Sequence, residues 1–411
     1  MSLSIETKLA ILQQTEYEWS RYIRWFQANK NSSLVVKPKK WTFKLQLLRV
    51  MAPVLSLRFS LLLLEIPKKI IIWAYVLVAT IKLRYLQKRG LKVIAIAGSY
   101  GKTSTKYIAH HVLSGSRKIL MTPENINTPI GIARLILSKL NSSHEVFLAE
   151  LGEYYPGDIA GLVHFLSPDY KILTPVGYAH MERFGSEENL KKALTELVTT
   201  EANKGKHFVY GKDYGENSVT DVQVSRAGTE FSYNERSFFI PLYGKHNAVN
   251  TLPALWLAQE FGIDLNMVAQ KLSSVAFIPH RLEPTLLEHN ILLLDNGYNA
   301  NPASSVETLS VVKELEASQK IIFTPGYIEL GDIQEHENEK LGKRIAQIAD
   351  VCVVIIGVNT QAIVKGLKTG GLEEDQIILA KGEQEGMEQI KNMVKPSAII
   401  LFENSVPELY K

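Results

Sequence analysis

Residues 91–105 read LKVIAIAGSYGKTST, and this stretch determines how the first large domain folds. Its first half consists of β-branched and small apolar residues, a composition typical of a strand buried on both faces of a parallel sheet. A turn with Gly98 and Gly101 follows, and then KYIAHHVL, in which apolar residues recur at helical spacing. A strand, a glycine turn and a helix form the setting that a phosphate-binding loop requires.

The side chains of this turn suit a polyphosphate. Glycines let backbone N–H groups approach phosphate oxygens, and the start of the helix adds a partial positive charge. Lys102 can reach the terminal phosphates, and the hydroxyl of Thr103 can bind Mg²⁺. The motif is the short form GxxGKT, because Ile96 stands where the longer form has its first glycine; the alternative is a glycine turn with a solvated lysine. The predicted ATP-binding residues here are Gly98, Ser99, Tyr100, Gly101, Lys102, Thr103 and Ser104.

Composition narrows the class of protein. A chain of 411 residues, 46% hydrophobic and 21% charged, is expected to form two or three domains. The net charge of +4 is slight, and we find no basic stripe with interleaved aromatics, so nucleic acid is not expected as a partner. The single cysteine, Cys352, lies in the apolar run VCVVIIG and is expected to be a core residue, which excludes an intrachain disulfide. We therefore expect a cytoplasmic active site.

Residues 1–90 are expected to form a helical, apolar segment. Residues 47–67 and 68–90 are strongly apolar, but charges such as Arg58, Glu65 and Lys69 interrupt them. Neither stretch offers the roughly 18 uninterrupted apolar residues of a membrane-spanning helix. Three interpretations stay open: a helical hairpin on an anionic membrane surface, a shallow pair of spans, or a soluble helical pair packed on the next domain or on a second subunit. We favour association with the inner face of the cell membrane.

Two further strands carry candidate metal ligands at their ends. Glu150 ends the apolar strand in HEVFLAELGE, and His180 follows the strand in DYKILTPVGYAH. Ligands gather at the carboxyl ends of strands in open α/β sheets, and a buried carboxylate is costly without a cation. We therefore expect Mg²⁺ at this edge. The alternatives are a helix cap for Glu150 and a structural role for His180.

The sequence after the first predicted sheet indicates a small β insert and a second α/β domain. Residues 204–244 alternate apolar and polar residues between Gly and Asn turns, a pattern that favours a small antiparallel β insert. From residue 279 onward, strands alternate with helices and predict another parallel sheet. We expect an apolar helical segment (1–90), a central P-loop ATPase domain with a parallel sheet (91–278) and a Rossmann-like α/β domain (279–411). Two domains that both contact a nucleotide would close over it.

A series of motifs resembles a known family. GSYGKTS, NINTPIG, AELGEYYPGDIA, VGYAHMERFGS, GKHNAVNTLPAL, PHRLEP, DNGYNANPAS and IELGD run in the order of the Mur ligase motifs, from about Val93 to about Gly357. The match is best to the branch that adds D-alanyl-D-alanine to the peptidoglycan precursor. Folylpolyglutamate synthetases share the phosphate-binding loop but match DNGYNANP less well.

The resemblance implies roles for individual residues. In such ligases the P-loop lysine, here Lys102, binds the β- and γ-phosphates. The implied Mg²⁺ ligands are Thr103, Glu150 and His180. Asp295, or the pair Asn299 and Asn301, could also be simple turn formers. The implied adenine contacts are Asn247 and Asn250, the implied nucleotide contacts of the last domain are Arg281, Asp295 and Asn299, and the implied phosphate and substrate loop contains Asn127 and Thr128.

The implied reaction is ATP-dependent, ADP-forming amide ligation through an acyl phosphate. The implied partners are a peptidoglycan precursor peptide and a small amine or dipeptide. Two other functions stay open: a membrane-associated nucleotide-binding scaffold without catalysis, and an amide ligase for folate or an amino-acid polymer.

Three features depart from the family pattern. The family's carbamylated lysine aligns with Leu194, so either Lys191, one helical turn away, replaces it or no carbamate is used. The basic KGSR-like loop near the C-terminus reads LFENSVPELYK, which leaves the amine substrate open. The apolar segment stands where the family has its domain for the UDP-sugar.

Overall fold

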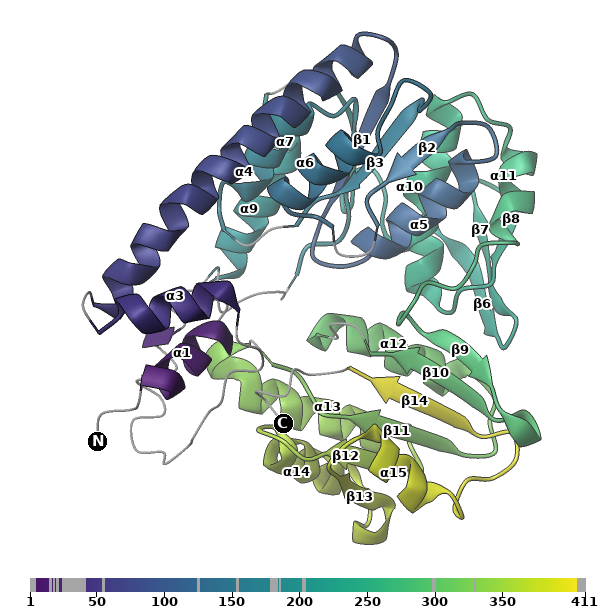
Figure 1. Cartoon of the computed structure of the whole chain (residues 1–411). Coiled ribbons are helices and arrows are strands. Elements are labelled where there is room, and N and C mark those ends of the chain that lie inside the picture. Colours follow the sequence, from purple (N-terminus) through teal and green to yellow (C-terminus); the bar gives the residue numbers. More distant parts are fainter. Residues whose placement is uncertain are drawn as a thin grey trace. The chain divides into compact units, whose positions relative to one another are not determined.

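The computed structural model divides into two compact units, residues 1–78 and 79–411. Figure 1 labels their helices and strands. The structure describes residues 5–14, 17, 19, 22–23, 42–53, 56–123, 126–152, 155–177, 184, 186–201, 205–297, 301–328 and 330–404. The predicted site residues His180 and Asn299 lie outside these ranges.

The first unit is helical. Its elements are α1 (Ile5–Gln14), α3 (Phe43–Met51) and the first part of α4 (Leu57–Gln87). Leu9, Leu12, Leu45 and Leu48 are fully buried in its small core. The expected pair of helices in residues 47–67 and 68–90 was wrong at the boundary between them, because α4 continues through Pro67. A proline removes one backbone hydrogen bond, but the Leu- and Ile-rich turns on both sides favour the helix and continue it.

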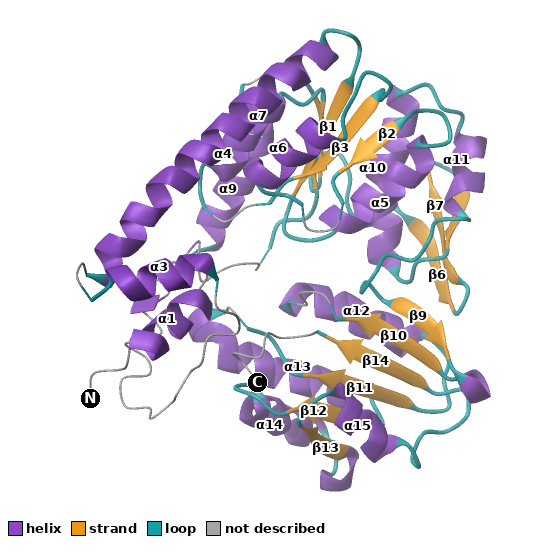
Figure 2. Cartoon of the chain, in the orientation of Figure 1, coloured by secondary structure: helices purple, strands orange, loops and turns teal. Residues whose placement is uncertain are grey.

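The second unit begins with a parallel sheet, as predicted. Its order is β2-β3-β1-β4-β5, and helices cover both faces (Figure 2). The register pairs Ile96 of β1 with Glu150 of β3, which brings the phosphate turn next to that carboxylate. The strands are β1 (Lys92–Ala97), β2 (Ile119–Met121), β3 (Val146–Glu150), β4 (Tyr170–Leu173) and β5 (Lys206–Val209). The helices are α5 (Lys102–Leu113), α6 (Pro129–Ser138), α7 (Asp158–Leu166), α9 (Glu187–Thr199), α10 (Lys245–Glu260) and α11 (Leu265–Leu272).

A small antiparallel sheet lies between β5 and α10 in the sequence. It has the order β6-β7-β8 and follows a short 3₁₀ helix, η1 (Glu216–Ser218). Although β5 falls within residues 204–244, it pairs parallel with β4, so antiparallel pairing begins at β6. The strands are β6 (Thr220–Ser225), β7 (Gly228–Tyr233) and β8 (Arg236–Ile240).

The last domain is a second, mixed sheet of order β13-β12-β11-β14-β10-β9. The predicted parallel pairing holds from β13 to β10, but the edge strand β9 is antiparallel to β10. Cys352 is fully buried in β12, as predicted. The strands are β9 (Glu283–Leu286), β10 (Leu292–Asn296), β11 (Lys320–Thr324), β12 (Val351–Ile355), β13 (Ile377–Ala380) and β14 (Ile399–Glu403). The helices are α12 (Pro302–Glu314), α13 (Gln334–Ala346), α14 (Thr360–Gly370) and α15 (Glu383–Ile390), with 3₁₀ turns η2 (Glu288–Asn290), η3 (Gly331–Ile333) and η4 (Glu374–Gln376).

Candidate functional site

The phosphate turn between β1 and α5 requires its glycines. Gly98 and Gly101 have φ values of 144° and 74°, which disfavour L side chains. A Cβ at Gly98 would also lie 2.1 Å from Oγ1 of Thr174, and one at Gly101 would lie 2.3 Å from Oδ1 of Asn250. The turn is held from β4, because the N–H groups of Ser99 and Tyr100 both donate to the carbonyl of Pro175. These contacts with the segment after β4 define the shape of the turn.

Helix α5 presents its positive end to this turn. The N-cap residue of α5 is Gly101, which has no side chain that could accept a hydrogen bond from the first N–H groups of the helix. These N–H groups can therefore bind an anion. Lys102, half-buried, donates from Nζ to the carbonyl of Gly98 and so lies over the turn. The residues predicted to hold phosphates thus form one cradle.

Glu150 is the centre of a buried polar cluster at the end of β3. The hydroxyl of Thr103 donates to the Glu150 carboxylate, 3.1 Å from Oε2 and 3.2 Å from Oε1. Lys106 Nζ lies 2.9 Å from the same Oε2. The Lys106 side chain is fully buried, and Glu150 is 4% exposed. Two predicted metal ligands therefore meet, and a lysine that the motifs did not single out joins them.

This donor set fits Mg²⁺. A hydroxyl and a carboxylate are the hard oxygen ligands that Mg²⁺ prefers, and they converge beside the phosphate cradle. The buried ammonium of Lys106 keeps the carboxylate paired within the protein. The sequence does carry a signal for Lys106, since KTSTK repeats a lysine four residues after Lys102, one turn along the same helix.

The predicted substrate loop reaches the same strand end. The carbonyl of Asn127 accepts from the N–H of Gly152, two residues after Glu150, at 3.0 Å. A Cβ at Gly152 would lie 2.6 Å from Cγ of Asn127, so the two segments approach closely. Thr128 caps α6 through its hydroxyl, which accepts from Gly131 N–H. Asn127 is thus near Glu150, while Thr128 orients the following helix.

The two asparagines of α10 occupy different surroundings. Asn250 faces the phosphate turn, as its approach to Gly101 shows, and its carbonyl accepts from Thr105 Oγ1 at 3.3 Å. Asn247 is 5% exposed and donates from Nδ2 to the carbonyl of Tyr243 at 2.8 Å. Its buried Oδ1 has no hydrogen-bond partner among the described residues. An exocyclic amino group such as that of adenine would satisfy this oxygen.

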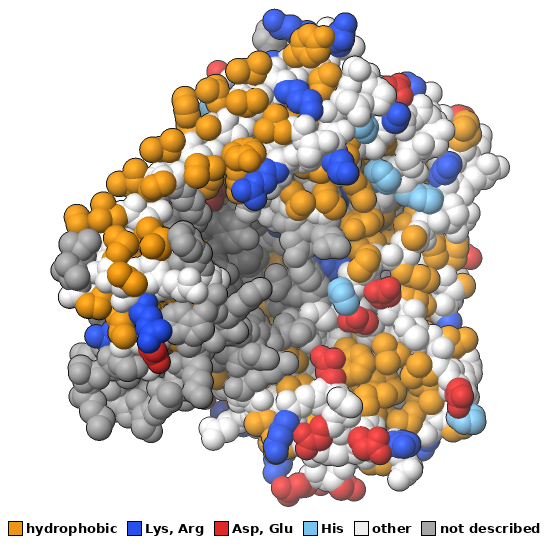
Figure 3. All heavy atoms as spheres, viewed as in Figure 1, with side chains coloured by type: hydrophobic (Ala, Val, Ile, Leu, Met, Phe, Trp, Pro, Cys, Tyr) orange, Lys and Arg blue, Asp and Glu red, His pale blue; other side chains and the backbone are white. Residues whose placement is uncertain are grey.

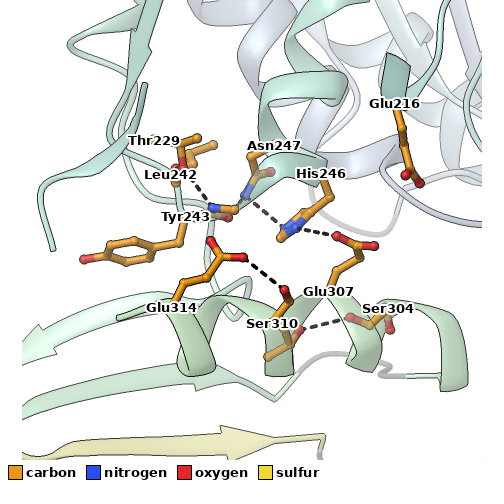
Figure 4. Close-up of polar contacts among 12 residues, drawn as sticks. Glu216, Thr229, Leu242, Tyr243, His246, Asn247, Ser304, Glu307, Ser310 and Glu314 are labelled. Atoms are coloured by element: carbon orange, nitrogen blue, oxygen red, sulfur yellow. Dashed lines mark hydrogen bonds and ion pairs between the residues drawn. The ribbon is translucent and has the colours of Figure 1, made fainter. Parts of the chain in front are cut away.

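The start of α10 meets α12 of the last domain. His246 Nδ1 lies 3.9 Å from the carboxylate of Glu307, and Figure 4 shows these side chains facing each other between the two helices. Burial, with a smaller effect of the Arg281 charge, lowers the pKa of His246 to about 4, so the imidazole is neutral near pH 7. Burial also raises the pKa of Glu307. The positive charge of Arg281, in the last domain, thus acts on His246 of the central domain.

Asp295 is organised by the segment that contains Arg281. His280 Nδ1 lies 2.7 Å from Oδ2 of Asp295, and this hydrogen bond raises the pKa of His280. Gly297 N–H donates to Oδ1 of Asp295 at 2.8 Å. His280, Glu283 and Asp295 bring one potential ligand atom each within 4.8 Å of one another, but the His–Asp hydrogen bond already joins two of them. The motifs PHRLEP and DNGYNANP thus meet in space.

Glu403 is a second group that the motifs did not identify. It ends β14 beside Asn296 of β10, where Asn296 Nδ2 and Ser305 Oγ donate to its carboxylate. Burial raises its pKa to about 7, against the opposing effects of these donors. Glu403 lies in LFENS, the stretch that departs from the family's basic loop.

The expected carbamylated lysine has no counterpart at Leu194. Leu194 is fully buried on the inner face of α9, together with Leu190 and Leu197. Lys191 is exposed on the same helix. The position that aligns with the family's lysine is part of the hydrophobic core.

The fold and this site define a P-loop nucleotide-binding protein with a central parallel sheet and a second α/β domain. Residues 96–214 match the Mur ligase middle domain. The sequence is 28% identical over 342 residues to the UDP-N-acetylmuramoyl-tripeptide–D-alanyl-D-alanine ligase of Bacillus subtilis, covering 78% of this chain and 74% of that one. Its identity to the enzyme of the same name from Escherichia coli is 28%, with 66% of each chain covered.

Solved structures agree with these sequence matches at the level of the fold. The MurF ligase from Thermotoga maritima in complex with ADP has a TM-score of 0.70 at 23% identity, covering 81% of this chain and 80% of that one. The match of residues 96–214 to the Mur ligase middle domain agrees with the family resemblance that the motifs indicated. The chain spans about two thirds to three quarters of the length of the two ligases compared in sequence.

Proposed function

We propose that the protein is an ATP-dependent, ADP-forming amide ligase that adds D-alanyl-D-alanine, or a similar amine, to a peptidoglycan precursor peptide. The observation that carries this proposal is the meeting of Lys102, Thr103 and Glu150 at one sheet edge. The names of the sequence relatives support the choice of substrates.

In the proposed reaction a substrate carboxylate attacks the γ-phosphorus of ATP, and ADP leaves. The amine then attacks the carbonyl carbon of the acyl phosphate, loses a proton and releases phosphate. Lys102 and the N–H groups of α5 bind the phosphates and stabilise the charge that develops on them. Thr103 and Glu150, with His180, would hold Mg²⁺, which when bound offsets further negative charge. Lys106 keeps the Glu150 carboxylate in position from inside the protein.

We propose that residues 91–278 and 279–411 act as the two domains that clasp the nucleotide. Asn247 and Asn250 would contact the base side, and Arg281, Asp295 and Asn299 would approach from the last domain. Closure would exclude water, which protects an acyl phosphate from hydrolysis. Asn127 would lie next to the reacting phosphate and substrate. Lys191 is the remaining lysine on α9 near the family's carbamate position, and its exposure argues for a site without a carbamate.

The test is product analysis with the full-length protein. ATP is incubated with D-alanyl-D-alanine and with soluble or lipid-linked precursor peptides, and ADP is measured beside the ligated product. We expect ADP formation that requires both the carboxylate and the amine and that Lys102→Ala abolishes. Turnover with folate and glutamate instead would identify the other class of amide ligase. ATP turnover that ignores every carboxylate and amine would contradict a ligase. We propose a cytoplasmic reaction, because ATP and the precursor peptide are cytoplasmic.

A further inference from the structure

Helix α4 exposes large apolar side chains along its length. Figure 3 shows groups of hydrophobic atoms that recur along this helix, with backbone and basic side chains between them. Trp73 is 67% exposed, Ile81 63% and Ile70 61%. We define the α4 stripe as Ile66, Ile70, Trp73, Leu77, Ile81 and Tyr85, which recur at three- and four-residue spacing and therefore share one side of the helix. An apolar surface of this extent marks an interaction site.

Basic residues predominate around the stripe, and the one acidic neighbour in α4 is Glu65, directly before Ile66. Residues 66–90 contain six basic residues and no acidic residue. Lys69 is exposed near the middle of α4, and Lys88 and Arg89 are exposed directly after it. The Arg89 guanidinium lies 5.0 Å from the ring centroid of Tyr85, so cation and aromatic ring are adjacent. A surface that combines apolar and aromatic groups with an excess of basic groups is complementary to anionic lipid.

The end of α4 is fixed to the central domain. Lys82 Nζ donates to the carbonyls of Ile136 and Leu137, at 2.9 and 3.0 Å, near the C-terminal end of α6. Arg84 and Gln87 donate to carbonyls at the C-terminal end of α7. These carbonyls lack intrahelical partners and gain most from such donors.

This attachment decides between spanning a membrane and lying on it. Within the described residues, one helical stretch is long and apolar enough to cross a membrane, Lys69–Gln87, and only 17% of it is buried. It contains all three donors that bind α6 and α7, so crossing would require them to leave those carbonyls. Lying in the interface leaves the donors in place and still covers the stripe.

A second copy of the chain fits this surface less well. Neighbours in sequence are exposed together, as in Ile70 with Ile71 and Leu77 with Val78. The exposed apolar arc is therefore wider than the narrow seam of a two-stranded coiled coil. Two copies would also bring like charges together.

We propose that the α4 stripe lies in the headgroup region of an anionic lipid bilayer, with the helix parallel to the surface and the remainder of the protein in water. The proposal goes beyond the ligase reaction and does not depend on it. Trp73 and Tyr85 have the amphipathic rings that this region favours.

The experiment is flotation of the full-length protein with vesicles of phosphatidylcholine alone and of phosphatidylcholine with phosphatidylglycerol. We expect binding to the anionic vesicles, weakened by salt, and release by alkaline carbonate. The triple variant Ile70→Ser, Trp73→Ser, Leu77→Ser should lower the partition coefficient on the order of a hundredfold. The matched control is Val358→Ser, which removes a 61% exposed apolar side chain from another part of the chain and should change nothing.

Other readings of the same experiment would overturn the proposal. These are no binding to anionic vesicles, equal binding to neutral vesicles, binding that the triple variant retains, or resistance to carbonate. A wild-type dimer in solution that the triple variant converts to monomer, without vesicle binding, would instead identify a second copy as the occupant. If the triple variant fails to fold, the variant Trp73→Phe tests the proposal instead. Brominated lipids should then quench the tryptophan fluorescence of the wild type more strongly than that of Trp73→Phe, and equal quenching would overturn the proposal.

Discussion

Removing the charge of Lys106 is expected to damage both stability and metal–nucleotide binding, because its ammonium is the buried partner of Glu150. The two side chains are 0% and 5% exposed, and Nζ lies 2.9 Å from Oε2. Breaking a buried pair from one side typically costs about 3–5 kcal/mol, since the other charge stays buried without its partner. The total free energy of unfolding of a native protein is about 5–15 kcal/mol, so Lys106→Met should lower the urea midpoint of unfolding substantially.

A double variant separates this effect from simple loss of packing. Lys106→Met with Glu150→Gln removes both charges and should recover most of the lost stability, although not Mg²⁺-ATP binding. Lys192→Met is the matched control, because Lys192 and Glu188 form a surface pair in which both side chains are more than three-quarters exposed, at 77% and 82%. Urea unfolding and titration with Mg²⁺-ATP measure the two quantities. An unchanged midpoint in the single variant, or a double variant as unstable as the single one, would refute the reasoning.

Three further predictions concern other parts of the second unit. Lys102→Ala should weaken ATP binding by roughly 10- to 150-fold, the range for a lost charged hydrogen bond, as measured by calorimetry. Gly101→Ala should cost about 1–3 kcal/mol of unfolding free energy because of its positive φ and the clash with Asn250. Adding Asn250→Ala to this variant should remove the clash but leave the backbone strain of the positive φ. Burial raises the pKa of Glu403 from 4.5 to about 7, so it favours folding below pH 4.5 and loses this contribution as pH rises to 7. Between pH 4.5 and pH 7, the unfolding free energy of the wild type should therefore fall by about 3 kcal/mol more than that of Glu403→Gln, as measured by urea unfolding at a series of pH values. If the two proteins show the same dependence of unfolding free energy on pH, Glu403 does not have this effect on stability.

Local patterns made much of the site predictable. The strand–turn–helix order of residues 91–105 predicted the glycine turn between β1 and α5, since glycines with positive φ and a helix start are encoded within a few residues. The position of Glu150 at this sheet edge was predictable because it ends an apolar strand, and parallel strands bring such ends to one edge. The pairing of Glu150 with Lys106 was not, because it depends on how α5 packs against β3.

Features that depend on packing between distant segments were predicted poorly. Pro67 suggested a helix boundary, but the apolar turns around it continue α4. The antiparallel pairing of β9 with β10 is set by the connection through η2, which the alternation of strands and helices did not indicate. The proximity of Arg281 to His246 joins two domains, and no local pattern encodes it. The burial of Glu403 likewise follows from its neighbours on β10 and α12.

The most direct test of an acyl-phosphate ligase at this site is to follow a carboxylate oxygen of the substrate into the released phosphate. The precursor peptide is labelled with ¹⁸O in its terminal carboxylate and incubated with ATP, Mg²⁺ and D-alanyl-D-alanine, and the released phosphate is examined by mass spectrometry. Our account predicts one ¹⁸O atom in phosphate for each amide bond formed, with neither product made by Lys102→Ala. Phosphate without label, or ADP released without an amide product, would contradict it.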